Sequence, residues 1–262
     1  MAGTRQALQY SALNWLALDA QMKAVRALEY ACRVPAAVVA ENQVGHIGRP
    51  RLVILPSPLA LGDEAWAQLV NYAKDGGTLL VTGSMERDRH WQPTARLRAL
   101  GLDAAAEPLT FHQAQLDLGG EKIPLAFAFD RQQFAEALAT PDGRTLHELS
   151  VGSGKIYVVN FPVELADGLE STAAVYRWAL AKLGFESPFT GTLPSPGVLM
   201  RRAVFRDALL YLFVSESAGD EEIALSDRET RARFHFRLDS RRARLLLLDR
   251  PSNKVLASFG ND

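Results

Sequence analysis

The segment from Arg51 to Thr82 constrains the fold most strongly, because its pattern is that of a strand, a helix and a strand in succession. The runs RLVIL (Arg51–Leu55) and TLLVT (Thr78–Thr82) are short and apolar, as expected of buried strands. Between them, AWAQLVNYAKDGG has acidic residues just before its start and Gly76 near its end, which are typical helix-terminus signals. Parallel neighbouring strands require a long crossover of this kind, so the segment predicts an α/β sheet.

The residues before this segment extend the same pattern. A short strand is predicted at Arg5–Ser11, a helix over Leu18–Arg33 and another buried strand at Ala36–Ala40. Together with Arg51–Leu55 and Thr78–Thr82, these elements predict a doubly wound α/β sheet.

Two hairpins are expected after the last of these strands. Leu109–Leu118 is predicted to pair with Lys122–Phe129 across two glycines. The stretch HELSVGSGKIYVVNF, His147–Phe161, contains a Gly-Ser-Gly-Lys that suggests a phosphate-binding loop, but the Walker pattern requires glycine where this chain has Leu149. A hairpin is therefore favoured and the phosphate loop is the alternative. A helix over Asp167–Leu183 follows.

The pattern changes after a segment rich in Pro, Gly, Ser and Thr between Gly184 and Gly197, which suits a domain boundary. Beyond it, short apolar or alternating runs are separated by turn residues with no helical period. They predict a small antiparallel β-sandwich over residues 198–262, following an α/β domain over residues 1–187. The expected strands are Val198–Arg202, Ala208–Ser215, Glu222–Leu225, Arg231–Leu238, Ala243–Leu248 and Val255–Phe259.

Composition excludes several classes of function. The 29 basic and 30 acidic side chains leave a net charge of -1, which gives no overall attraction to nucleic acid or to an anionic membrane. The arginines of Thr230–Arg250 alternate with apolar residues, as in a half-buried strand. Cys32 is the single cysteine, so no internal disulfide can form. We find no signal peptide and no apolar run long enough to span a bilayer, and we expect a cytoplasmic protein.

Ligands of open α/β sheets bind beyond the carboxyl ends of the strands. The predicted strands place a set of polar and aromatic residues there, which could line a cleft for a sugar or small metabolite, with Trp15 or Trp91 as a stacking surface. The alternative interpretation is that they are ordinary loop polar groups and helix caps. The candidate residues are Ser11, Asn14, Trp15, Glu41, Asn42, Ser57, Ser84 and Asn160.

The sequence offers little for catalysis. Ser84 lies in GSME and lacks the G-x-S-x-G elbow of a nucleophilic serine, and Cys32 lies near the end of a predicted helix. The five histidines are dispersed without the spacing of a metal site, so neither a metal nor a cofactor is expected. The spacing of carboxylates such as Glu86 and Glu164 does not indicate a glycosidase acid pair, and we interpret them as solvated loop charges. A small hydrolase that uses Ser84 or Cys32 remains a third hypothesis.

Several stretches resemble the non-catalytic C-terminal part of family 42 glycoside hydrolases, the β-galactosidases, and their relatives. In the first domain these are RLVILPSPLALGDEAWAQLVNYAKDGGTLLVTGS and SVGSGKIYVVNFPVELAD. In the second they are VLMRRAVFRDALLYLFVSESAGDEEIAL and ARLLLLDRPSNKVLASF. In that family a TIM barrel carries the two catalytic carboxylates, an amidotransferase-like α/β domain mediates trimerisation, and a small β-domain follows.

The resemblance implies a flavodoxin/amidotransferase-like α/β domain and a β-sandwich without the barrel, because a barrel alone needs about 250 residues. No catalytic residue of the family can therefore be assigned to a position here. The leading hypothesis is a non-catalytic assembly or scaffold module. The implied partners are further copies of the chain, as a trimer, or a cognate TIM-barrel domain; the alternative is a sugar-binding module.

Overall fold

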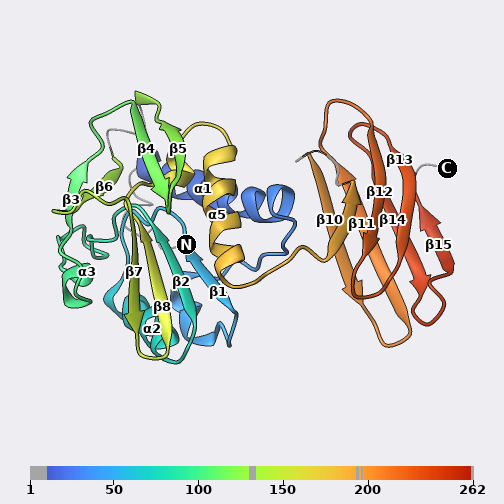
Figure 1. Ribbon diagram of the computed structural model, residues 1–262, viewed down its shortest axis with the longest axis horizontal. Helices are drawn as coiled ribbons and strands as arrows, with labels where there is room; N and C mark the ends of the chain where they lie inside the picture. Colours follow the sequence, from blue (N-terminus) through green and yellow to red (C-terminus); the bar gives the residue numbers. More distant parts are fainter. Residues whose placement is uncertain (1–10, 130–133, 193–194, 196, 261–262) are drawn as a thin grey trace. The chain divides into compact units, whose positions relative to one another are not determined.

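A computed structural model describes residues 11–129, 134–192, 195 and 197–260, and it divides the chain into two compact units (Figure 1). The first unit contains the residues up to Val25 and Ala37–Gly184. The second unit contains Arg26–Ala36 and the chain from Phe185 onward. The sequence did not indicate that Arg26–Ala36 would join the second unit.

The central sheet of the first unit has four strands in the order β1-β2-β8-β7. They are β1 (Leu52–Leu55), β2 (Thr78–Thr82), β8 (Gly154–Val159) and β7 (Leu146–Val151). The first three are parallel and β7 is antiparallel to β8. The hairpin predicted around the GSGK motif is thus confirmed, and its Gly152 has the left-handed φ of 58° that glycine tolerates.

Helices cover both faces of this sheet. Helix α2 (Asp63–Lys74) packs Leu69 and Ala73 into a core with Leu79 and Ile156. Side chains alternate along a strand, so Tyr157 lies on the opposite face. There its ring meets that of Trp178 of α5 (Glu170–Lys182) edge-on, with centroids 4.9 Å apart. The sheet is therefore enclosed between helices, as its apolar strands require.

The remaining elements of the first unit are short. Helix α1 (Ser11–Arg26) begins the described chain and continues into η2 (Ala27–Ala31) of the second unit. The hairpin predicted across Gly119 and Gly120 is confirmed as β4 (Gln113–Leu118) and β5 (Glu121–Ala126). The others are η3 (Glu41–His46), α3 (Arg96–Ala99), β3 (Ala105–Pro108) paired with β6 (Glu136–Ala139), and η4 (Val163–Leu165).

One predicted strand does not appear, and another lies almost entirely outside the described residues. Ala36–Ala40 has no strand pairing, and its Val38 is 56% exposed. A short apolar run has no periodicity that distinguishes a buried strand from a connecting segment, which explains the error. The prediction Arg5–Ser11 lies outside the described residues except for Ser11, which begins α1. The unit is therefore mixed α/β. In its described sheet, successive parallel strands are added on one side only, from β1 through β2 to β8, whereas a doubly wound sheet adds strands on both sides of its first strand.

The second unit is an antiparallel β-sandwich. One sheet has the order β10-β11-β14-β15 and the other β13-β12-β9. Both contribute to one core, which includes Tyr211, Phe213, Ile223 and Phe234. The six predicted strands are confirmed, whereas β9 lies in the predicted linker. The strands are β9 (Phe189–Thr192), β10 (Val198–Val204), β11 (Ala208–Ser215), β12 (Glu221–Asp227), β13 (Arg233–Leu238), β14 (Ala243–Asp249) and β15 (Val255–Phe259).

Candidate functional site

A buried carboxyl group organises the carboxyl ends of the parallel strands. Glu164, in η4 after β8, is 1% exposed. Its Oε2 accepts hydrogen bonds from the hydroxyls of Ser57, after β1, at 2.5 Å and Thr82, in β2, at 2.6 Å. Its Oε1 accepts one from the hydroxyl of Tyr176, in α5, at 2.6 Å. One side chain thus joins three strand ends to the helix that covers them.

The surroundings of Glu164 favour its neutral form. Burial raises the pKa of this carboxyl above its ordinary value, and the bonds from Ser57, Thr82 and Tyr176 only partly oppose that rise. In the described chain this carboxyl is bonded by the three hydroxyls and by its own backbone N–H, and no cationic side chain is among its partners. Both oxygens of Glu164 are therefore occupied and enclosed, and its bonds tie η4 to β1, β2 and α5.

A second polar cluster lies at the end of β2. Glu136, in β6, accepts hydrogen bonds from Arg87 Nε at 3.0 Å and Nη2 at 2.6 Å through its Oε1. Its Oε2 accepts one from the Ser84 hydroxyl at 3.2 Å. This hydrogen bonding raises the pKa of the Arg87 guanidinium. The cluster fixes the loop after β2 against β6.

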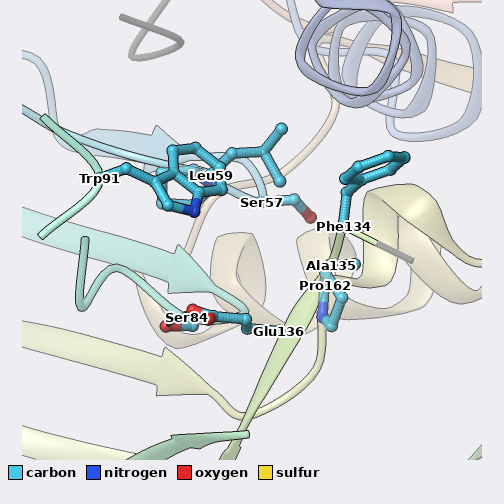
Figure 2. A pocket seen from close by; sticks show the side chains of 9 residues that line it. Ser57, Leu59, Ser84, Trp91, Phe134, Ala135, Glu136 and Pro162 are labelled. Atoms are coloured by element: carbon cyan, nitrogen blue, oxygen red, sulfur yellow. Dashed lines mark hydrogen bonds between the residues drawn. The ribbon is translucent and has the colours of Figure 1, made fainter. Parts of the chain in front are cut away.

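The two clusters border one small pocket, shown in Figure 2. Ser57 contributes from one side and Ser84 with Glu136 from the other. The space that a water molecule can occupy is only about 10 Å³, which is room for about one water. A monosaccharide does not fit this pocket as it stands. The apolar part of its wall consists of Pro58, Leu59, Trp91, Phe134, Ala135 and Pro162.

The structure brings only two of the eight candidate residues, Ser57 and Ser84, to this pocket. Asn160 is buried at the end of β8 and donates to the carbonyl of Arg144 at 2.8 Å, while no described residue bonds to its Oδ1. The other candidates do not line it. Glu41 accepts a hydrogen bond from the Gly62 amide at 2.6 Å, and Asn42 is exposed in η3. The remaining three lie in α1: Ser11, Asn14 and Trp15, the last of which is 65% exposed.

Sequence reasoning did not assign Glu136, Thr82 or Tyr176 to the site, and it treated Glu164 as a solvated loop charge. Burial overturns that interpretation of Glu164. The available signal was the position of Glu164 directly after the strand ending near Asn160, where a polar group meets the ends of neighbouring strands. Glu136 carried no signal, because it reaches the site only through the pairing of β6 with β3.

The geometry for nucleophilic catalysis is incomplete among the described residues. Ser84 is 6% exposed and its hydroxyl contacts a carboxylate, but no histidine lines the pocket. A serine nucleophile needs an activating base and an oxyanion hole. Within the same residues, no group of three or more His, Cys, Asp or Glu side chains is arranged to hold a metal ion.

No protein-family model matches the chain, and no curated protein matches it. Solved structures do. The chain superimposes on Gan42B, a GH42 β-galactosidase of G. stearothermophilus, with a TM-score of 0.65 at 15% identity over 87% of this chain. The chain has the fold of part of a GH42 β-galactosidase. The β-galactosidase of Bacillus circulans sp. alkalophilus superimposes with a TM-score of 0.64 at 13% identity over 88% of this chain. The cold-adapted enzyme of Rahnella sp. R3 gives a TM-score of 0.65 at 14% identity over 87%.

The likeness to GH42 β-galactosidases covers a portion of those enzymes. The chain spans 36% of Gan42B and of the Rahnella enzyme and 37% of the Bacillus enzyme. At these identities the likeness establishes the fold alone. No helix in the described residues is long and apolar enough to cross a membrane.

Proposed function

We propose that this chain is a non-catalytic assembly module related to the GH42 β-galactosidases, with an amidotransferase-like α/β unit that associates with further copies. The observation that carries the proposal is the match of most of this chain to about a third of those enzymes. The sandwich serves as a second structural unit in this proposal.

The side chains at the strand ends support a structural role. A glycosidase requires two carboxyl groups that face each other across a cleft large enough for the sugar. Glu164 is enclosed by three hydroxyls, and Glu136 is held by Arg87 and Ser84 beside a space for about one water. These groups stabilise loops in this arrangement and leave no cleft for a substrate.

The proposal is tested by measuring activity and mass on the purified chain. We expect no hydrolysis of a chromogenic β-galactoside, and we expect light scattering to give a multiple of the 28.7 kDa chain mass, with a trimer as the family resemblance implies. Hydrolysis that is abolished by Glu136→Gln would replace the proposal with an enzymatic one. A monomer at every concentration would refute assembly through the α/β unit.

Sugar binding, which requires this pocket to widen, is a second candidate because Trp91, an aromatic residue suited to stacking on a sugar, lines the pocket. Its test is a titration with galactose monitored by tryptophan fluorescence. A saturable change that Trp91→Phe abolishes and Trp15→Phe preserves would support it. An unchanged signal in the native chain would exclude galactose at this pocket.

A further inference from the structure

A hollow lies on the outer face of the β13-β12-β9 sheet of the sandwich. Side chains alternate along each strand, so the residues between those of the core point outward. In register, Thr190 of β9, Ser226 of β12 and Arg233 of β13 form one row across the sheet. All three line the hollow, together with Ala224 and His235 of the next row.

The hollow is much larger than the pocket at the strand ends of the first unit. Water can occupy about 310 Å³ of it, compared with about 10 Å³ in that pocket. Its floor is low because β12, the central strand, places the small side chains of Ala224 and Ser226 beside the longer Arg233 and His235 of β13. Ligand pockets in proteins have volumes from about 300 Å³ upward. The hollow therefore has room for a molecule of the size of a monosaccharide.

The charged groups that line the hollow are basic. Arg233 and His235 line it, and within the described chain no Asp or Glu does. The other basic residues on this face of β13 have acidic partners: His235 Nε2 lies 3.2 Å from Glu222 Oε1, and Arg237 forms an ion pair with Asp220. Arg233 has no hydrogen-bond or ion-pair partner among the described residues. Its guanidinium is therefore available to an anion from outside the chain.

The row through Arg233 is suited to an oxyanion that is attached to a sugar. A guanidinium presents a planar fork that bonds two oxygens of a phosphate or sulfate at once. The neighbouring Ser226 hydroxyl, to which no described residue bonds, supplies a further donor. Thr190 Oγ1 donates to the Ser226 carbonyl at 3.3 Å and keeps its lone pairs for a ligand hydroxyl. The row thus offers donors at one end and an acceptor at the other.

We propose that this hollow binds a sugar that carries a phosphate or sulfate group. Arg233 and Ser226 hold the anionic group, and Thr190 accepts a hydrogen bond from a sugar hydroxyl. An oxyanion alone fills only part of the 310 Å³, so the remaining space takes the sugar ring. The Kd is on the order of 1 mM, because Arg233 is exposed and solvent screens its charge. The site belongs wholly to the second unit, so it does not depend on assembly through the α/β unit.

NMR titrations of the full ¹⁵N-labelled chain test this site. With galactose 6-phosphate and galactose 6-sulfate as probes, we expect saturable shifts of the amides of Thr190, Ser226 and Arg233. Neutral galactose should bind at least about tenfold more weakly, because it lacks the charge-assisted hydrogen bonds. Arg233→Gln should weaken binding of both esters by a similar factor without affecting the fold, because the side chain is exposed. Arg237→Gln, on the same face of β13 but outside the hollow, is the matched control and should leave the affinity unchanged.

The absence of saturable shifts at these amides with both esters would overturn the site. Equal affinity in the native chain and in Arg233→Gln would overturn it as well. Binding of only one ester supports the site and identifies the anionic group. Inorganic phosphate is the remaining probe: weaker binding than that of the esters supports the contribution of the sugar, whereas equal binding would overturn the assignment to a sugar. None of these results affects the assembly proposal, which is tested by the mass of the chain.

Discussion

Replacing Glu164 with Gln is expected to remove a pH dependence from the stability of the first unit. The carboxyl is 1% exposed, and burial raises its pKa above the ordinary value of 4.5. The folded chain therefore holds this proton at pH values where the unfolded chain has lost it. The resulting stabilisation is fully present below the unfolded pKa and is lost as the pH rises through the folded pKa.

The size of this effect follows from one proton. Where the folded chain is protonated and the unfolded chain is not, the free energy of unfolding falls by about 1.4 kcal/mol per pH unit. The amide introduced by Glu164→Gln does not titrate, and it retains hydrogen-bonding capacity toward Ser57, Thr82 and Tyr176. The stability of this variant relative to the native chain should therefore increase with pH at up to that slope, until the folded carboxyl ionises.

Urea unfolding monitored by tryptophan fluorescence measures this difference, from about pH 5 to about pH 8. All four tryptophans, at positions 15, 66, 91 and 178, belong to the first unit, so the signal reports on that unit. Glu121→Gln, on the exposed hairpin strand β5, is the matched control and should run parallel to the native chain. If Glu164→Gln also runs parallel to the native chain at every pH, the inference of a raised pKa is wrong.

Two further substitutions test the packing of each unit. Arg33 is 6% exposed and donates hydrogen bonds to the carbonyls of Val198 and, at 2.9 Å, Ser195. Arg33→Ala should therefore destabilise the second unit by about 3 kcal/mol. Faster amide hydrogen exchange in β10 would show this loss, and unchanged exchange would contradict it. Gly154→Ala would place a Cβ 2.2 Å from two backbone carbonyl oxygens and should lower the melting temperature sharply. The control is Gly219→Ala, where the added Cβ would meet no other atom within 4 Å. This substitution should change the free energy of unfolding by less than about 0.5 kcal/mol.

Local signals account for the elements that the sequence predicted well. The hairpin around GSGK follows from two apolar runs separated by glycines, and its Gly154 lies against backbone carbonyls of α2 and the following turn, where no side chain fits. The helix after Arg51–Leu55 carried its own start and stop residues. Such signals act within a few residues and do not depend on the rest of the chain.

The candidate site was predicted only in part because its residues meet through tertiary packing. Ser57 and Ser84 follow strands that are neighbours in the sheet, so sequence order was enough to bring them to one pocket. Glu41 and Trp15 were assigned to the same edge through the strands Ala36–Ala40 and Arg5–Ser11; the first is not a strand, and Ser11 of the second begins a helix. An error in one strand therefore removed the site residues that depended on it.

The sequence by itself determined the strand–helix–strand succession of residues 51–82, the change from α/β to all-β near Gly184, and the apolar character of LLYLF and RLLLL, because these depend on residue type and spacing. The tertiary structure alone decided which polar groups became buried and which apolar groups stayed outside. Glu164 is enclosed because three strand ends and α5 converge on it. Leu212 and Leu245 point outward because the alternation along β11 and β14 gives the core to Tyr211 and Leu246.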